Sequence, residues 1–107
     1  MKIAVPLFGE RISPHFATAP EALLVQTEGG RVCATWRIDL AGLSAAERRA
    51  KFLGLGIETL LCGGIDELSR AWFEKKGVHV QENRMGNVRE LLEMYVKQTG
   101  NTRSSGG

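Results

Sequence analysis

Two side chains in this sequence could bind a soft metal, and each follows a predicted buried strand. His15 lies in the segment 13–16, Ser-Pro-His-Phe, and Cys62 begins the segment 62–65, Cys-Gly-Gly-Ile. In an open α/β sheet, the loops at the carboxyl ends of parallel strands converge on the ligand crevice. We therefore expect both segments to face one pocket, where an imidazole and a thiolate together suit a soft metal or a metal–sulfur cluster.

The loop that carries His15 is longer than a hairpin requires. It runs from Gly9 to Phe16, and Pro14 biases Ser13 toward an extended backbone. We expect His15 to ligate a metal or to donate a hydrogen bond to an anionic ligand, with Ser13 as a further contact. The alternative is a histidine that only packs its own loop.

Cys62 and the residues after it form the second candidate. The glycines at Gly63 and Gly64 let a ligand approach the backbone, and the amides of Gly63, Gly64 and Ile65 precede a predicted helix, which favours negative charge. On this interpretation the pKa of the Cys62 thiol falls below its usual value of about 8.5, and the thiolate is a metal ligand. The alternative is a buried cysteine that ends a core strand.

Two arginines lie in loops that should reach the same edge of the sheet. Arg11 follows the first predicted strand and Arg84 follows the last. Each could offset the negative charge of an anion bound above the strand ends, and the alternative for each is a solvated side chain. The second histidine, His79, lies inside a strand pattern and is interpreted as structural.

The elements that position these residues are three strands followed by alternating helices and strands. Strands are predicted at 2–8, 21–27, 32–38, 59–62 and 78–81, and helices at 44–54, 66–77 and 87–100. Hairpins make the first three strands antiparallel, and right-handed crossovers make the later strands parallel to the first. This predicts a three-layer, ribonuclease H-like α/β fold. Its five-stranded mixed sheet has the order 3-2-1-4-5 and helices on both faces.

The third predicted strand shows the clearest alternation. Its apolar residues are Val32, Ala34, Trp36 and Ile38, and polar residues stand between them. A period of two predicts a half-exposed strand at a sheet edge, with Cys33 on the face opposite Trp36.

Composition narrows the class of protein. A formal net charge of +2 with scattered basic residues argues against a nucleic-acid partner. No apolar stretch approaches the ~20 residues that cross a bilayer, so no membrane association is expected. The two cysteines are too few and too far apart for a disulfide framework, which favours the reducing cytoplasm. We expect one domain over residues 1–98 and a disordered polar tail over residues 99–107.

Four segments, taken in order, resemble the dinitrogenase iron–molybdenum cofactor biosynthesis family. They are 2–6 (Lys-Ile-Ala-Val-Pro), 11–16 (Arg-Ile-Ser-Pro-His-Phe), 61–65 (Leu-Cys-Gly-Gly-Ile) and 77–80 (Gly-Val-His-Val). The resemblance covers residues 1 to about 98 and implies a nitrogenase accessory factor-like domain. It maps the family's cofactor-binding histidine onto His15. The chain departs from many relatives at Ala17, where they have glycine, and a role in nitrogen fixation is not implied.

The residues and the resemblance together favour a small cytoplasmic, non-enzymatic accessory or carrier protein. Its cargo would be an iron–molybdenum cofactor-like cluster or another molybdenum–sulfur or iron–sulfur cluster, with iron or copper as further metals. His15 and Cys62 would be the metal ligands. Its protein partner would be a donor or an acceptor of the cluster.

Two other functions stay open. One is a thiol enzyme that uses a Cys62–His15 pair, although no third orienting residue is evident. The other is a regulatory or adaptor domain of the same fold that holds no ligand. A ribonuclease H-like nuclease is excluded, because its metals need clustered carboxylates, one of them on the first strand, and residues 2–8 contain none.

Overall fold

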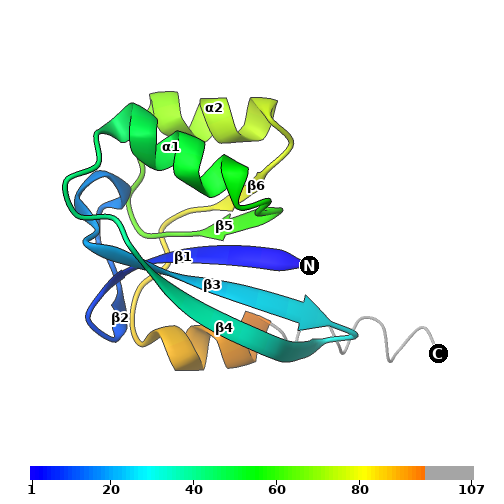
Figure 1. Ribbon diagram of the computed structural model, residues 1–107. Coiled ribbons are helices and arrows are strands. Elements are labelled where there is room, and N and C mark those ends of the chain that lie inside the picture. Colours follow the sequence, from blue (N-terminus) through cyan, green and yellow to red (C-terminus); the bar gives the residue numbers. More distant parts are fainter. Residues whose placement is uncertain (96–107) are drawn as a thin grey trace.

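The computed structural model describes residues 1–95, and in them a mixed sheet lies between two helical layers (Figure 1). The strands and helices are β1 (Lys2–Phe8), β2 (Arg11–Ile12), β3 (Glu21–Glu28), β4 (Arg31–Asp39), α1 (Ala45–Gly54), β5 (Thr59–Leu61), α2 (Glu67–Lys75) and β6 (His79–Gln81). A short 3-10 helix spans Phe16–Thr18, and a further helix runs from residue 88 to the last described residue. The predicted tail lies outside the described residues.

Within the described residues the sheet has six strands, so the prediction of five strands in the order 3-2-1-4-5 needs correction. The order is β4-β3-β1-β5-β6, and β2 pairs with β1 off this path. The extra strand arises because the loop after β1 folds back and pairs antiparallel with it through Phe8 and Arg11. The five longer strands keep the predicted neighbours and directions. β3 is antiparallel to both of its neighbours, β1 and β4, whereas β5 is parallel to both of its neighbours, β1 and β6.

Pro6 limits how far the central strand pairs. On one side, β1 pairs with β3 along most of its length, including Pro6 with Ala22. On the other side, the parallel pairing with β5 covers only Ile3 and Ala4. Proline has no amide to donate to a ladder, so pairing toward β5 stops before it. The Pro6 carbonyl instead accepts a hydrogen bond of 2.9 Å from the Ser13 amide, which draws the next loop against β1.

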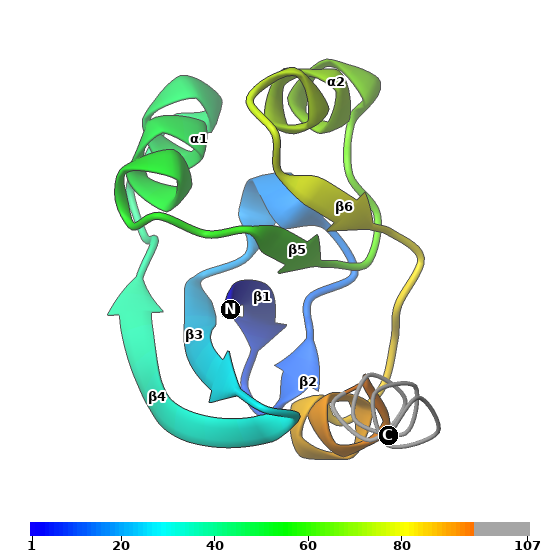
Figure 2. The same ribbon diagram turned by 90° about the vertical axis from the view of Figure 1, so that its right-hand side faces the viewer.

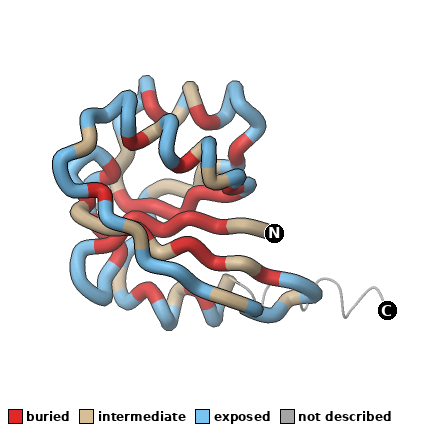
Figure 3. Tube along the Cα trace, viewed as in Figure 1, coloured by how far each residue is buried: buried red, intermediate tan, exposed pale blue. Residues whose placement is uncertain are grey.

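Two apolar cores lie on opposite faces of the sheet. Figure 2 shows α1 and α2 above one face and the helix over residues 88–95 below the other. Under α1 and α2, the rings of Phe16, Phe52 and Phe73 pack with centroids 5.7–6.4 Å apart. On the other face, Val88 and Leu92 pack against alternate residues of β1. Figure 3 shows the resulting buried β1 and the exposed outer strand β4.

Side-chain caps begin the helices where the sequence predicts. Ser44 and Glu47 form a reciprocal capping box at the start of α1. The Asp66 carboxylate accepts from the Ser69 amide at the start of α2, and the Asn87 side chain accepts from the Arg89 amide at 2.9 Å. No helix within the described part of the chain is long and apolar enough to cross a membrane.

The edge strand β4 contains a bulge that the alternation did not predict. Gln26 pairs with Ala34 but Thr27 pairs with Val32, so Cys33 is an extra residue. The bulge resets the side-chain alternation, and the prediction that Val32 shares a face with Trp36 is wrong. Val32 instead shares a face with Thr35, since both line one groove on the side of the sheet away from α1 and α2.

Candidate functional site

The loop that carries His15 is hydrogen-bonded to the glycine segment after β5. The Phe16 amide donates to the Gly64 carbonyl at 2.8 Å, and the Gly64 amide donates to the Pro14 carbonyl at 2.7 Å. These two bonds form a parallel bridge between His15 and Gly64. The two segments therefore lie side by side at one edge of the sheet.

Gly63 and Gly64 are required because the two loops lie so close together. A Cβ atom on Gly63 would stand 2.5 Å from the Ser13 carbonyl oxygen and 3.0 Å from that of Pro14. A Cβ atom on Gly64 would stand 2.9 Å from the Pro14 oxygen and 3.4 Å from His15 Nδ1. On this side of the segment, the His15 loop itself occupies the space that was predicted to admit a ligand.

We expect Gly63→Ala to destabilise the folded protein by about 1–3 kcal/mol, because the added methyl group meets backbone atoms that cannot rotate aside. Chemical denaturation measures the change in free energy of unfolding. Gly54→Ala is the matched control, since a Cβ atom there meets nothing within 4 Å. It should leave stability unchanged or raise it slightly, because alanine favours a helix. Equal effects of the two substitutions would contradict the close-approach explanation.

Ser13 holds the backbone of His15 in place. Its side chain is buried, and its hydroxyl donates to the His15 carbonyl at 3.0 Å and accepts from the His15 amide at 3.4 Å. The hydroxyl hydrogen is thus already used within the loop. His15 and Pro14 are exposed, so the loop presents the imidazole on a constrained backbone.

A buried arginine that the sequence analysis missed lies beneath this loop. Arg48 is only 4% exposed, and its guanidinium donates to the carbonyls of Phe16 at 3.2 Å, Ala19 at 2.5 Å and Leu40 at 3.4 Å. Within residues 1–95 no carboxylate pairs with it, its Nε has no hydrogen-bond partner, and desolvation lowers its pKa. The burial of Arg48 could have been predicted from its spacing, because it lies four residues before Phe52 and therefore on the same face of α1. Arg48 therefore fastens the short helix that follows His15.

Cys62 faces the core and not the solvent. Its side chain is fully buried in the same cluster as Phe16 and Phe73. Burial, together with the smaller effect of the negative charge of Glu82, raises the pKa of the thiol to about 12. The prediction of a lowered pKa is wrong, because the side chain of this strand-end residue packs beneath the helices, away from the amides at the start of α2. Within the described residues, no three His, Cys, Asp or Glu side chains converge as a metal-ion site.

A third loop joins the same edge of the sheet. The Arg84 amide donates to the Cys62 carbonyl and the Asn83 amide to the Gly63 carbonyl, both at 2.9 Å. The Arg84 side chain is exposed and donates to Gln81 Oε1 at 2.7 Å. The loop after β6 is therefore anchored to the glycine segment.

Arg11 reaches this third loop from β2. Its backbone bridges antiparallel to Asn87, and the neighbouring Ile12 amide donates to the Gly86 carbonyl at 2.9 Å. The Arg11 side chain is exposed. The structure thus brings the backbones of the loops bearing His15, Arg11 and Arg84 together around one edge, and leaves Cys62 in the core.

A family model described as dinitrogenase iron-molybdenum cofactor matches residues 1–98. The match includes the segments of His15 and Cys62. The uncharacterized protein MJ0580 of Methanocaldococcus jannaschii is 21% identical over 103 residues, which cover 91% of this chain and 86% of the relative.

Solved structures share the fold. The crystal structure of PH0822 superposes with a TM-score of 0.87 at 18% identity, covering 92% of this chain and 90% of that one. A crystal structure from Methanocaldococcus jannaschii named for a dinitrogenase gives 0.78 at 18% identity, covering 92% and 89%. A Thermotoga NMR structure named for NifB gives 0.68 at 20% identity, covering 90% and 87%.

Proposed function

Because the chain belongs to the dinitrogenase iron–molybdenum cofactor family, we propose that it is a small accessory protein that carries a molybdenum–sulfur or iron–sulfur cluster without transforming it. The observation that carries this proposal is the placement of His15. Its imidazole is exposed at the edge where three loops meet, and its backbone is bonded on both sides to Ser13 and through the bridge to Gly64. A metal-ligating side chain whose backbone is already constrained loses little conformational entropy when the cluster binds.

The donor set favours a preassembled cluster over a single metal ion. A structural metal ion takes about four protein ligands, and residues 1–95 hold no group of three suitable side chains. A metal–sulfur cluster brings its own sulfide ligands, so one imidazole can complete its coordination. The same thin set of protein ligands suits a carrier that must release its cargo.

Two exposed arginines on neighbouring segments support an anionic cargo. Arg11 of β2 and Arg84 of the loop after β6 are exposed, and long guanidinium side chains can reach sulfide or oxo groups. Among the backbone donors, the Gly64 amide is already used by Pro14. The amides of Gly63 and Ile65 donate no backbone hydrogen bond within residues 1–95, so we assign any amide contacts to them.

Neither Cys62 nor a catalytic role is part of this proposal. A thiol enzyme needs a thiolate beside its base, whereas Cys62 is buried and burial keeps its pKa near 12. We place the protein in the cytoplasm, where its free cysteines stay reduced, and class its sheet with the ribonuclease H-like folds. Its partner would be a protein that donates or accepts the cluster.

Anaerobic reconstitution tests the proposal. The purified chain is incubated with tetrathiomolybdate and either iron(II) or copper(I), then separated from small molecules by gel filtration. We expect a charge-transfer absorption band and molybdenum to elute with the protein, with one cluster bound to each chain. A protein that elutes without colour or metal would contradict the carrier function and favour a ligand-free adaptor domain.

A further inference from the structure

A groove of about 750 Å³ lies on the opposite face of the sheet from α1 and α2. Its apolar lining comes from Leu23 and Val32 of the sheet and from Val88 and Leu92 of the last helix. Among residues 1–95, two helices cover one face of the sheet and one helix covers the other, and β4 curves past that helix (Figure 2). Glu10 is the one lining residue that comes from the loop between Gly9 and Phe16, and neither His15 nor the glycine segment lines the groove.

The groove has the size and lining of a small-molecule site. Its volume falls within the roughly 300–1,000 Å³ that such sites occupy, and they are mostly apolar with a few polar groups. Val32 remains 45% exposed in its wall, although valine is normally buried. An apolar ligand would remove this surface from water.

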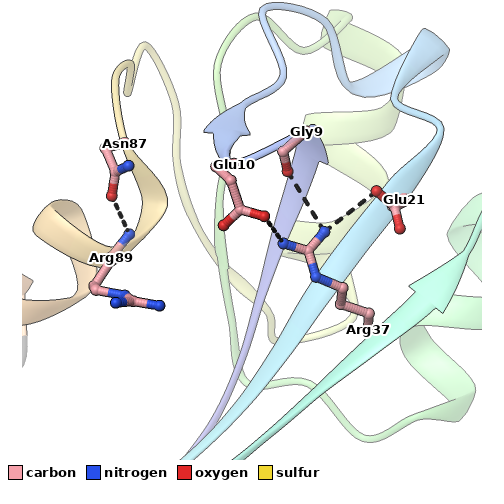
Figure 4. A network of polar contacts seen from close by, with 6 residues as sticks. All are labelled: Gly9, Glu10, Glu21, Arg37, Asn87 and Arg89. Carbon is pink, nitrogen blue, oxygen red and sulfur yellow. Dashed lines mark hydrogen bonds and ion pairs between the residues drawn. The ribbon is translucent and has the colours of Figure 1, made fainter.

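One rim of the groove is held in place by a charge network. Arg37 of β4 donates to Glu10 at 2.6 Å, to Glu21 at 3.3 Å and to the Gly9 carbonyl at 3.5 Å (Figure 4). This network ties the edge strand to the β1–β2 hairpin. It also neutralises Arg37, so that residue offers little charge to a ligand.

The remaining charges of the lining are mostly positive. Arg31 and Arg89 line the groove, and neither guanidinium has an ion-pair partner within residues 1–95. Glu93 is the acidic residue of the lining that is likewise unpaired within those residues. Two free arginines against one glutamate favour an anion over a cation or a neutral molecule.

We propose that this groove binds an amphipathic anion, a molecule with an apolar body and one acidic head group. The apolar body lies against Leu23, Val32 and the last helix. The head group pairs with Arg31 and Arg89, since a guanidinium can bind a carboxylate through two hydrogen bonds. The site is separate from the proposed cluster site and does not depend on it.

Calorimetric titration with dodecanoate and with dodecanol, both below their aggregation limits, tests this inference. Dodecanoate should bind with one site per chain, and at least about tenfold more tightly than dodecanol, because a charge-assisted hydrogen bond contributes that much or more. Equal affinities, or no binding of dodecanoate, would overturn the proposal.

Substitutions locate the ligand. The double variant Arg31→Gln with Arg89→Gln should weaken dodecanoate binding about tenfold or more and leave dodecanol binding unchanged. Glu93→Gln should strengthen dodecanoate binding, which a variant damaged in folding would not do. Thr35→Trp, in the exposed edge strand, should obstruct the groove and weaken both ligands. Unchanged dodecanoate binding in the arginine and glutamate variants would overturn the assignment, and thermal unfolding confirms that each variant is folded.

Discussion

His15→Ala should weaken retention of a reconstituted molybdenum–sulfur cluster by about ten- to a hundredfold while leaving the thermal midpoint almost unchanged. The loss corresponds to one ligand or charge-assisted hydrogen bond, about 1.5–3 kcal/mol of binding. The fold should tolerate the change because the imidazole is exposed, and such substitutions usually alter stability by within about 0.5 kcal/mol. Cluster titration and thermal unfolding of the free protein are measured side by side.

His79→Ala is the matched control for this prediction. His79 is also exposed, but it begins β6 and so lies at the opposite end of the parallel strands from His15. Its removal should leave cluster retention unchanged. His15→Gln separates hydrogen bonding from metal ligation, because an amide can donate a hydrogen bond but is a poor ligand for a soft metal. Equal losses from His15→Ala and His79→Ala would remove His15 from the site.

Alkylation should modify Cys33 at least a hundredfold faster than Cys62 in the folded protein, whereas the lowered pKa expected from the sequence would have made Cys62 the more reactive thiol. Cys33 is exposed on the edge strand, whereas Cys62 is fully buried. Burial raises the pKa of Cys62 to about 12, which leaves this thiol roughly a thousandfold or more less ionised at neutral pH than an ordinary cysteine. Because the thiolate is the reactive form, the rate at Cys62 should still be rising with pH above 9.

Peptide mass spectrometry after timed exposure to iodoacetamide assigns the two rates. In a Cys33→Ser variant, Cys62 should stay unmodified in buffer and react quickly in urea. This result would show that burial in the folded protein protects the thiol, and that the thiol is reactive once exposed. If Cys62 reacts as fast as Cys33 without denaturant, the buried placement is contradicted. That result would favour a thiol enzyme that uses the Cys62–His15 pair.

The sequence by itself determined the five longer strands and their neighbours, and it missed the short strand β2. The apolar run of β1, the alternation of β4 and the capping box at Ser44 are local patterns, and the structure confirms each element. The meeting of His15 with Gly64 also follows from sequence, because hairpins and right-handed crossovers leave few ways to order the strands.

Only the tertiary structure decided which way the site's side chains point and what fills the space between loops. A strand-end residue can face either the core or the ligand edge, and packing against the phenylalanine cluster places Cys62 in the core. In the sequence, Arg48 cannot be told from a solvated helical arginine. Only the folded structure shows the carbonyls of Phe16 and Ala19 that accept its hydrogen bonds. The bulge at Cys33 and the groove beneath β4 likewise arise from pairing and curvature between distant segments. Local patterns determine secondary structure because each residue's neighbours along the chain are known, whereas these features depend on contacts that exist only after folding.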